Sequence, residues 1–207
     1  MSQYFQIHPD NPQSRLIHQA AEIVRGGGVL AYPTDSTYAL GCSLNSKGGV
    51  ERIRRIRQLD DKHNFSVMCR DLSEIAAYAR VDNATYRFLK AHTPGPYTFI
   101  LQASHEVPRR ILHTKRRAVG IRVPDNRIAL ELLAALSEPL MSVTLRMPGD
   151  EYPLIDPWEI RELLENQLDL VINGGFCGLE PTTVIDLVDG APRLVRLGRG
   201  AVEGLGD

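Results

Sequence analysis

Helix-like and strand-like segments alternate along almost the whole chain, and this alternation limits the fold more than any other feature of the sequence. Residues 14–25 and 126–136 carry apolar side chains at helical spacing. Residues 29–32 and 97–101 are short and apolar, and glycine or proline precedes them. The alternation predicts an α/β domain. Further strands are expected over 64–69, 118–124, 139–145, 168–172 and 181–187, and further helices around 50–56, from 71, over 83–90 and from 156.

The length of the chain predicts a single domain. Its 207 residues are enough to bury a sizeable core, and they contain neither an internal repeat nor a long linker. No apolar stretch approaches the roughly 20 residues that a membrane-spanning helix needs. The first 15 residues lack the basic start and apolar segment of a signal peptide. We therefore expect one domain, no membrane partner and, by default, a cytoplasmic location.

The cysteines and histidines do not indicate a metal centre built by the protein. Cys42, Cys69 and Cys177 are far apart, without the CxxC spacing of a thiolate zinc site. The six histidines are scattered, without HxxxH spacing. We expect no metal ligands from protein side chains, and any metal would arrive with a phosphate ligand.

A polar segment follows the strand expected over 29–32, within the run GGGVLAYPTDSTYALG. One interpretation is an ordinary turn, because serine, threonine, aspartate and proline are common in turns for conformational reasons. The other is a ligand site, because loops held by a rigid sheet are where ligands usually bind. The segment alone leaves both open. The side chains concerned are Thr34, Asp35, Ser36, Thr37 and Tyr38.

Arg122 lies inside the apolar run AVGIRVP, which is an unusual place for a charge. A buried charge needs a partner, so Arg122 either pairs with a carboxylate or faces a ligand. Thr182 leads into another expected strand, and Arg196 lies in a further strand-like run. Together these residues are consistent with one concave site for a polyanion or a nucleotide. The chain has no GxSxG, Walker A or GxGxxG motif, so hydrolase, P-loop and Rossmann interpretations lack support.

Basic residues cluster in two segments, although the formal net charge of the chain is only -1. Arginine and lysine make charge-assisted contacts to phosphate, on a nucleotide or on an RNA backbone. A solvated basic surface explains the same pattern, so both interpretations stay open. The clusters comprise Arg52, Arg54, Arg55 and Arg57 in one segment, and Arg109, Arg110, Lys115, Arg116, Arg117 and Arg122 in the other.

Five motifs in a fixed order, YPTDSTYALG, TPGPYTFIL, VGIRVP, PTTVIDL and LVRLGRG, give the chain a family resemblance. It resembles the YrdC/YciO-like family from about residue 16 to residue 200, and the YciO branch in particular. The resemblance implies one domain over residues 10–201, with an open, twisted mixed sheet, flanking helices and a concave electropositive cavity. Synthases of this family join L-threonine, bicarbonate and ATP into threonylcarbamoyl-AMP for tRNA modification. Some members are described as binding double-stranded RNA or tRNA.

The resemblance also implies roles for individual residues. Ser36 and Thr182 match hydroxyls that hold threonine, and Arg122 matches the arginine that clamps the amino-acid carboxylate, a bidentate contact that lysine makes poorly. Arg196 falls where the family meets the nucleotide, and ATP would bring Mg²⁺. No catalytic nucleophile is expected, because such chemistry depends on positioning and charge stabilisation. The full sets are Thr34, Ser36, Arg122, Ser142 and Thr182 for threonine, and Arg57, His63, Thr144, Arg146 and Arg196 for the nucleotide.

The chain departs from the synthases at two signatures. Arg57, Gln58 and Leu59 stand where the synthases carry a Lys-x-Arg pair. Thr144, Leu145 and Arg146 replace a Ser-x-Asn signature, so an amide becomes a guanidinium. We therefore expect a nucleotidyltransferase of the synthase type with weak or redirected activity. The alternative is a protein that binds double-stranded RNA or tRNA through Arg109, Arg110, Lys115, Arg116 and Arg117, without synthase turnover.

Overall fold

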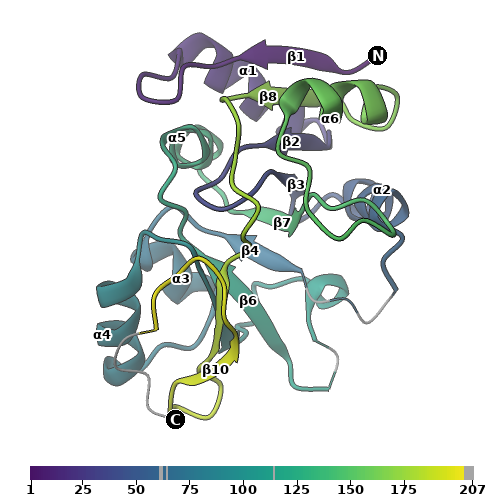
Figure 1. Ribbon diagram of the computed structural model, residues 1–207. Coiled ribbons are helices and arrows are strands. Elements are labelled where there is room, and N and C mark those ends of the chain that lie inside the picture. Colours follow the sequence, from purple (N-terminus) through teal and green to yellow (C-terminus); the bar gives the residue numbers. More distant parts are fainter. Residues whose placement is uncertain (61–62, 64, 114, 203–207) are drawn as a thin grey trace.

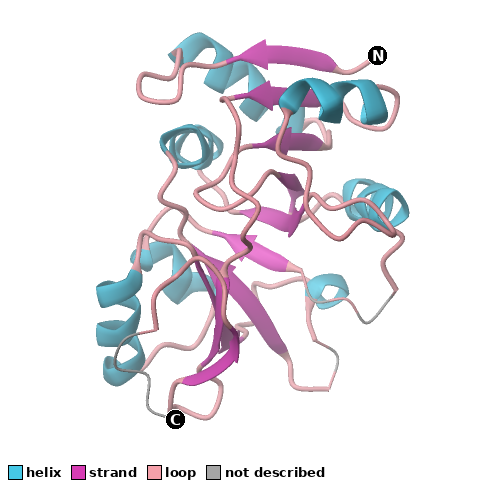
Figure 2. Cartoon of the chain, viewed as in Figure 1, coloured by secondary structure: helices cyan, strands magenta, loops and turns pink. Residues whose placement is uncertain are grey.

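The computed structural model describes residues 1–60, 63, 65–113 and 115–202. These residues form ten strands of one mixed sheet, in the order β1-β8-β2-β3-β7-β4-β6-β5-β9-β10. Figure 1 shows the strands turning from nearly level at β1 and β8 to steep at β6 and β10, so the sheet is strongly twisted. Helices flank the sheet on both sides (Figure 2). The predicted single-domain α/β fold is confirmed.

Strands and helices follow one another along most of the chain. The strands are β1 (Gln3–Gln6), β2 (Leu30–Tyr32), β3 (Ala39–Ser43), β4 (Ser66–Met68), β5 (Tyr97–Gln102), β6 (Ala118–Arg122), β7 (Leu140–Thr144), β8 (Leu170–Asn173), β9 (Thr183–Asp186) and β10 (Arg193–Arg196). The helices are α1 (Ser14–Arg25), α2 (Lys47–Arg57), α3 (Leu72–Tyr78), α4 (Asn83–His92), α5 (Arg127–Leu136) and α6 (Pro157–Leu164), with a short 3-10 helix, η1 (Arg109–Ile111).

Apolar residues on alternate sides of the strands build a core on each face of the sheet. Helices α1 and α5 pack against each other on the face that carries Leu30, Tyr32 and Leu140. The opposite face, which includes Ala31 and Val67, packs against the other helices. Those helices contribute Ile53 from α2, Ile75 from α3, Leu89 from α4 and Ile160 from α6. The apolar stripes expected from helical spacing over 14–25 and 126–136 are buried in α1 and α5, whereas α3 buries a single apolar residue, Ile75.

Local capping fixes the ends of the helices. Ser46 Oγ accepts a hydrogen bond from the Gly49 amide at 3.0 Å and begins α2. Gln58, with a left-handed φ of 49°, ends α2 and leaves Arg57 in its last turn. At the start of α3, Asp71 Oδ1 accepts a hydrogen bond from the Glu74 amide at 2.9 Å, and Glu74 Oε2 accepts one from the Arg70 amide at 2.6 Å, as in a capping box.

Two strands were not predicted. Gln3–Gln6 form β1, which pairs in parallel with β8, so the sheet begins before residue 10. Ala39–Ser43 form β3, which pairs with β2 and β7 on its two sides. The strand expected over 64–69 is observed as β4, with Asn64 outside the described residues. Over the described part of the chain, no helix combines the length and the hydropathy needed to span a membrane.

Candidate functional site

A cavity of about 790 Å³ lies on one face of the sheet. Its walls include residues from β7, β4, β6, β5, β9 and β10, six strands that are adjacent in the sheet. Ser142 is in register with Gly41, and Gly41 is in register with Leu30, which packs under α1 and α5. Registered residues point to the same face, so the cavity opens on the side of α1 and α5, beyond the part of the sheet that they cover.

A row of registered residues forms the floor of the cavity. Ser66 pairs with Ser142 across β4 and β7, and with Gly120 across β4 and β6. Gly120 in turn pairs with Ile100 on β5. All four residues line the cavity, and we call them the floor row: Ser142, Ser66, Gly120 and Ile100. The floor is therefore rigid sheet rather than loop.

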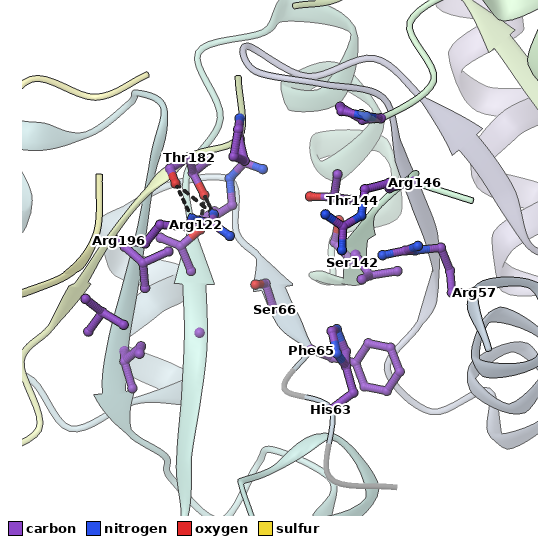
Figure 3. A pocket seen from close by; sticks show the side chains of 18 of the residues that line it. Arg57, His63, Phe65, Ser66, Arg122, Ser142, Thr144, Arg146, Thr182 and Arg196 are labelled. Atoms are coloured by element: carbon purple, nitrogen blue, oxygen red, sulfur yellow. Dashed lines mark hydrogen bonds between the residues drawn. The ribbon is translucent and has the colours of Figure 1, made fainter. Parts of the chain in front are cut away.

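Among the described residues, five arginines and two carboxylates line the cavity, so this lining is electropositive as expected. In Figure 3, Arg122 and Arg196 lie at one end with Thr182, and Arg57 and Arg146 lie at the other with Thr144. Like charges that line one cavity repel one another, and a bound anion reduces that repulsion. The arginines are Arg57, Arg116, Arg122, Arg146 and Arg196, and the carboxylates are Glu151 and Glu180.

Arg57 and Arg146 form an uncompensated pair of cations. Among the described residues, neither guanidinium takes part in an ion pair, and Arg57 Nε is a buried donor without a hydrogen-bond partner. Burial, followed by the charge of Arg146, lowers the pKa of Arg57 to about 10. His63 lines the same end, where burial and the neighbouring Arg57 and Arg54 lower its pKa. This end of the cavity is suited to a multiply charged anion.

Arg122 is buried at the other end and is held by the polar loop after β2. Its Nη2 donates to Asp35 Oδ1 at 2.7 Å and to Ser36 Oγ at 3.2 Å. Both side chains of the Arg122–Asp35 pair are only 7% exposed. Of the two predicted possibilities for Arg122, a carboxylate partner is therefore present. Arg122 also lines the cavity, and its Nε is a buried donor with no hydrogen-bond partner among the described residues.

Hydrogen bonds of Thr34 stabilise the loop that contacts Arg122. Thr34 Oγ1 donates to the Thr37 carbonyl at 2.6 Å and accepts from the amides of Ser36 and Thr37. Asp35 Oδ2 accepts from the Asp125 amide at 3.1 Å. Thr34 and Ser36, expected to contact threonine, are not among the residues that line the cavity; the structure places them next to Arg122.

Thr182 and Arg196 complete the Arg122 end. Thr182 Oγ1 lies 2.7 Å from Thr98 Oγ1, and Arg196 Nη2 donates to the Thr182 carbonyl at 2.8 Å. Partial burial, followed by the charges of Arg122 and Arg146, lowers the pKa of Arg196. Thr182 and Arg196 thus occupy the cavity wall, as expected for substrate-binding residues.

Ser142 is fixed from within the core. Tyr32 Oη lies 2.7 Å from Ser142 Oγ, and burial raises the pKa of Tyr32 to about 12. The Tyr32 ring crosses above Gly41, where an added Cβ would lie 2.9 Å from the ring. A side chain larger than hydrogen at position 41 would push the ring away, so Gly41 allows Tyr32 to reach Ser142.

The basic residues expected to bind RNA do not act as one group. Arg110 donates to the Leu44 carbonyl, and Arg116 forms an ion pair with Asp186 at 2.7 Å and lines the cavity. Arg109, Lys115 and Arg117 are exposed. Of the five, Arg116 is therefore bound to a carboxylate and Arg110 to a backbone carbonyl, whereas the side chains of Arg109, Lys115 and Arg117 have no partner among the described residues.

Several residues of the site were not predicted. Ser66 is a polar residue in an otherwise apolar strand, which is a weak signal in the sequence. Tyr32, Thr98 and Asp186 reach the site through contacts to residues distant in the sequence. In the part of the chain that the structure describes, no group of three or more His, Cys, Asp or Glu side chains is placed to hold a metal ion.

Comparison with known proteins gives consistent matches. A family model described as Sua5_yciO_yrdC, Telomere recombination, matches residues 22–198. The uncharacterized protein YciO of Escherichia coli strain K12 is 59% identical over 203 residues, covering 98% of both chains. Its crystal structure gives a TM-score of 0.95 at 58% identity and covers 99% of this chain and 100% of YciO.

Synthases are more distant relatives. The threonylcarbamoyl-AMP synthase of Halorhodospira halophila is 29% identical over 185 residues, which cover 88% of this chain and 95% of the synthase. The crystal structure of P. abyssi Sua5 complexed with L-threonine gives a TM-score of 0.86 at 25% identity. The match covers 94% of this chain and 57% of the Sua5 chain.

Proposed function

The chain belongs to the Sua5/YciO/YrdC family, and from this premise we propose that it is an ATP-dependent synthase of the threonylcarbamoyl-AMP type. The resemblance stated from five sequence motifs is confirmed. In the proposed reaction, L-threonine, bicarbonate and ATP give threonylcarbamoyl-AMP, diphosphate and water. The family includes such synthases, which supports an enzymatic role.

The unpaired cations at one end of the cavity are the observation that most supports this function. Arg57 and Arg146 face the same cavity and have no acidic partner among the described residues. A nucleoside triphosphate such as ATP is an anion that would offset both charges. Each charge-assisted hydrogen bond contributes roughly 1.5–3 kcal/mol to the free energy of binding. In this proposal, Arg146 makes the phosphate contacts that the arginine of the Lys-x-Arg pair and the asparagine of the Ser-x-Asn signature would make in the synthases. Mg²⁺ would enter as a partner of the nucleotide phosphates.

The other end of the cavity suits the amino acid. The guanidinium of Arg122 is oriented by Asp35, so its remaining donors are positioned for a carboxylate before the substrate arrives. Thr182 supplies a hydroxyl at this end, and Ser142 supplies one from β7, on the side of Thr144 (Figure 3). Threonine carries a carboxylate, an ammonium group and a hydroxyl, and these match the donors and acceptors at this end.

Release of diphosphate tests the proposal. The purified chain with ATP, Mg²⁺, bicarbonate and L-threonine is expected to release diphosphate and to form threonylcarbamoyl-AMP, identified by mass spectrometry. Arg57→Met should weaken ATP binding by about tenfold to a hundredfold. The same change should raise the free energy of unfolding by roughly 1–3 kcal/mol, because the folded protein no longer buries an uncompensated charge.

Arg55→Met is the matched control, since Arg55 is exposed in the same turn of α2 and should change neither quantity. Equal diphosphate release by wild type and Arg57→Met, or release that does not require L-threonine and bicarbonate, would contradict the proposed function.

Binding of double-stranded RNA or tRNA is the second candidate function. It is favoured by the exposed side chains of Arg109, Lys115 and Arg117, near the cavity residues His113 and Arg116. Replacing these three residues by glutamine should weaken RNA binding. It should also reduce the slope of the logarithm of the binding constant against the logarithm of the salt concentration, by an amount equivalent to about three phosphate contacts. Filter binding across a range of salt concentrations measures both effects. Binding that does not change with salt would exclude a phosphate-backbone interaction.

A further inference from the structure

Tyr32 places a hydroxyl inside the apolar core under α1 and α5, where a phenylalanine would fill the same space. The side chain is fully buried and packs in one cluster with Leu30, Ile128 and Leu140. A buried hydroxyl without a hydrogen-bond partner destabilises the folded protein. Among the described residues, the partner of Tyr32 Oη is Ser142 Oγ, at 2.7 Å. Tyr32 itself does not line the cavity, whereas Ser142 does.

We propose that Tyr32 is a positioning residue, which donates a hydrogen bond to Ser142 Oγ and leaves the O–H of Ser142 to donate to a ligand in the cavity. The distance alone allows either hydroxyl to be the donor. If Ser142 donated, the O–H of Tyr32 would be a buried donor with no acceptor in the described part of the chain. If Tyr32 donates, the O–H of Ser142 faces the cavity, where water or a ligand accepts it. The second arrangement satisfies both groups.

The strand register explains how a core residue reaches the cavity wall. Ser142 on β7 is in register with Gly41 on β3, and Gly41 is in register with Leu30 on β2. Tyr32 lies two residues beyond Leu30, so its side chain crosses β3 diagonally. The ring passes over Gly41, where an added Cβ would lie 2.9 Å from it. The contact between Tyr32 and Ser142 therefore depends on the absence of a side chain at position 41.

The hydroxyl of Tyr32 stays protonated at neutral pH. Burial raises the pKa of Tyr32 to about 12, so the neutral form, which can donate, is the one present. Ser142 is 3% exposed, and its hydroxyl is held from the core side. Because its O–H is directed to the cavity, Ser142 favours a ligand oxygen that accepts a hydrogen bond. The arginines of the lining also act only as donors, so both kinds of residue select the same kind of ligand atom.

Ligand affinities, measured by calorimetry, separate positioning from a general structural effect. L-threonine and ATP with Mg²⁺ are titrated separately, and this choice of ligands rests on the proposed function. Ser142→Ala identifies the ligand that Ser142 contacts, which is expected to be L-threonine. Tyr32→Phe keeps the ring, and it should weaken binding of that same ligand by about two- to tenfold and leave the other ligand unchanged. In the Ser142→Ala background, Tyr32→Phe should have no further effect on affinity.

Urea unfolding tests the direction of the hydrogen bond without any ligand. Ser142→Ala leaves the buried O–H of Tyr32 without an acceptor and should lower the urea midpoint by roughly 0.5–1.5 M. Tyr32→Phe should lower it by less, because water in the cavity can still contact Ser142. The double variant should regain most of the loss caused by Ser142→Ala. A larger loss for Tyr32→Phe than for Ser142→Ala, or no recovery in the double variant, would contradict donation by Tyr32.

Tyr86→Phe and Ser73→Ala are the matched controls, since both residues are exposed on helices and both variants should behave as wild type. Tyr32→Phe that binds both ligands as tightly as wild type, or that weakens both equally, overturns the positioning role whether or not the protein is a synthase. If the wild type binds neither ligand, the proposed function fails, while the urea midpoints still support or overturn donation by Tyr32.

Discussion

Arg122→Gln is expected to lower diphosphate release by about a hundredfold or more. Arg122 is buried and lines the cavity, and its Nε has no hydrogen-bond partner in the part of the chain that the structure describes. Glutamine cannot make the two charge-assisted bonds that a guanidinium offers to a carboxylate, and each is worth roughly 1.5–3 kcal/mol. The rate at saturating ATP, measured as a function of L-threonine concentration, gives the loss. Retention of more than half of the wild-type activity would contradict the assigned role.

Loss of activity must be separated from loss of stability, because Arg122 also neutralises a buried carboxylate. Removing the arginine leaves Asp35 unpaired, which should lower the free energy of unfolding by about 3–5 kcal/mol. The double variant Asp35→Asn/Arg122→Gln should recover much of this stability and remain as inactive as Arg122→Gln. Arg15→Gln, at an exposed position on α1, controls for the substitution itself.

Asp186→Asn is expected to lower the free energy of unfolding by about 2–4 kcal/mol at pH 7. Asp186 is 3% exposed and joins three parts of the chain. It accepts hydrogen bonds from Arg116 at 2.7 Å and 3.3 Å, from Arg193 at 3.0 Å and from the Val188 amide at 3.0 Å. Urea unfolding of both proteins measures the difference. Asp189→Asn is the control, since Asp189 is exposed and 4.0 Å from Arg116.

The stabilisation by Asp186 should depend on pH with a definite sign. Burial alone would raise the pKa of Asp186, but the hydrogen bonds from Arg116, the Val188 amide and Arg193 outweigh it and hold the pKa below its usual value. The contribution is therefore complete above the pKa of an unfolded aspartate, about 3.9, and is lost as the pH falls through the folded value. The difference between wild type and Asp186→Asn should shrink below about pH 4. A constant difference from pH 7 to pH 3 would contradict this.

The order of helices and most strands followed from periodicity, because those segments bury one face and the sequence shows it. β1 was missed because Gln3–Gln6 contain only two apolar residues between glutamines. β3 was missed because small residues follow a turn-like segment. In both cases, pairing with partners distant in the sequence determines the strand, which local propensity does not reveal.

The site was predictable where a residue conflicts with its surroundings, and not where it depends on register. A charge inside an apolar strand identified Arg122, and shared motifs identified Thr182 and Arg196. The basic run over 109–117 gave no sign that Arg110 and Arg116 are bound to residues 66 and 70 positions away. Ser66 lies on the cavity floor because β4 pairs with β6 and β7.

The floor row also bears on how this site can diverge among relatives. Each of its four residues comes from a different strand, and the backbone of each strand is held by its neighbours. A substitution on one strand therefore alters one subsite while the other subsites keep their positions. Arg57 and Arg146, where the expected synthase signatures are altered, lie at the end of α2 and just after β7, away from Arg122 and Thr182. The ligand contacts of such a site can therefore be replaced one residue at a time while the backbone of the sheet stays the same.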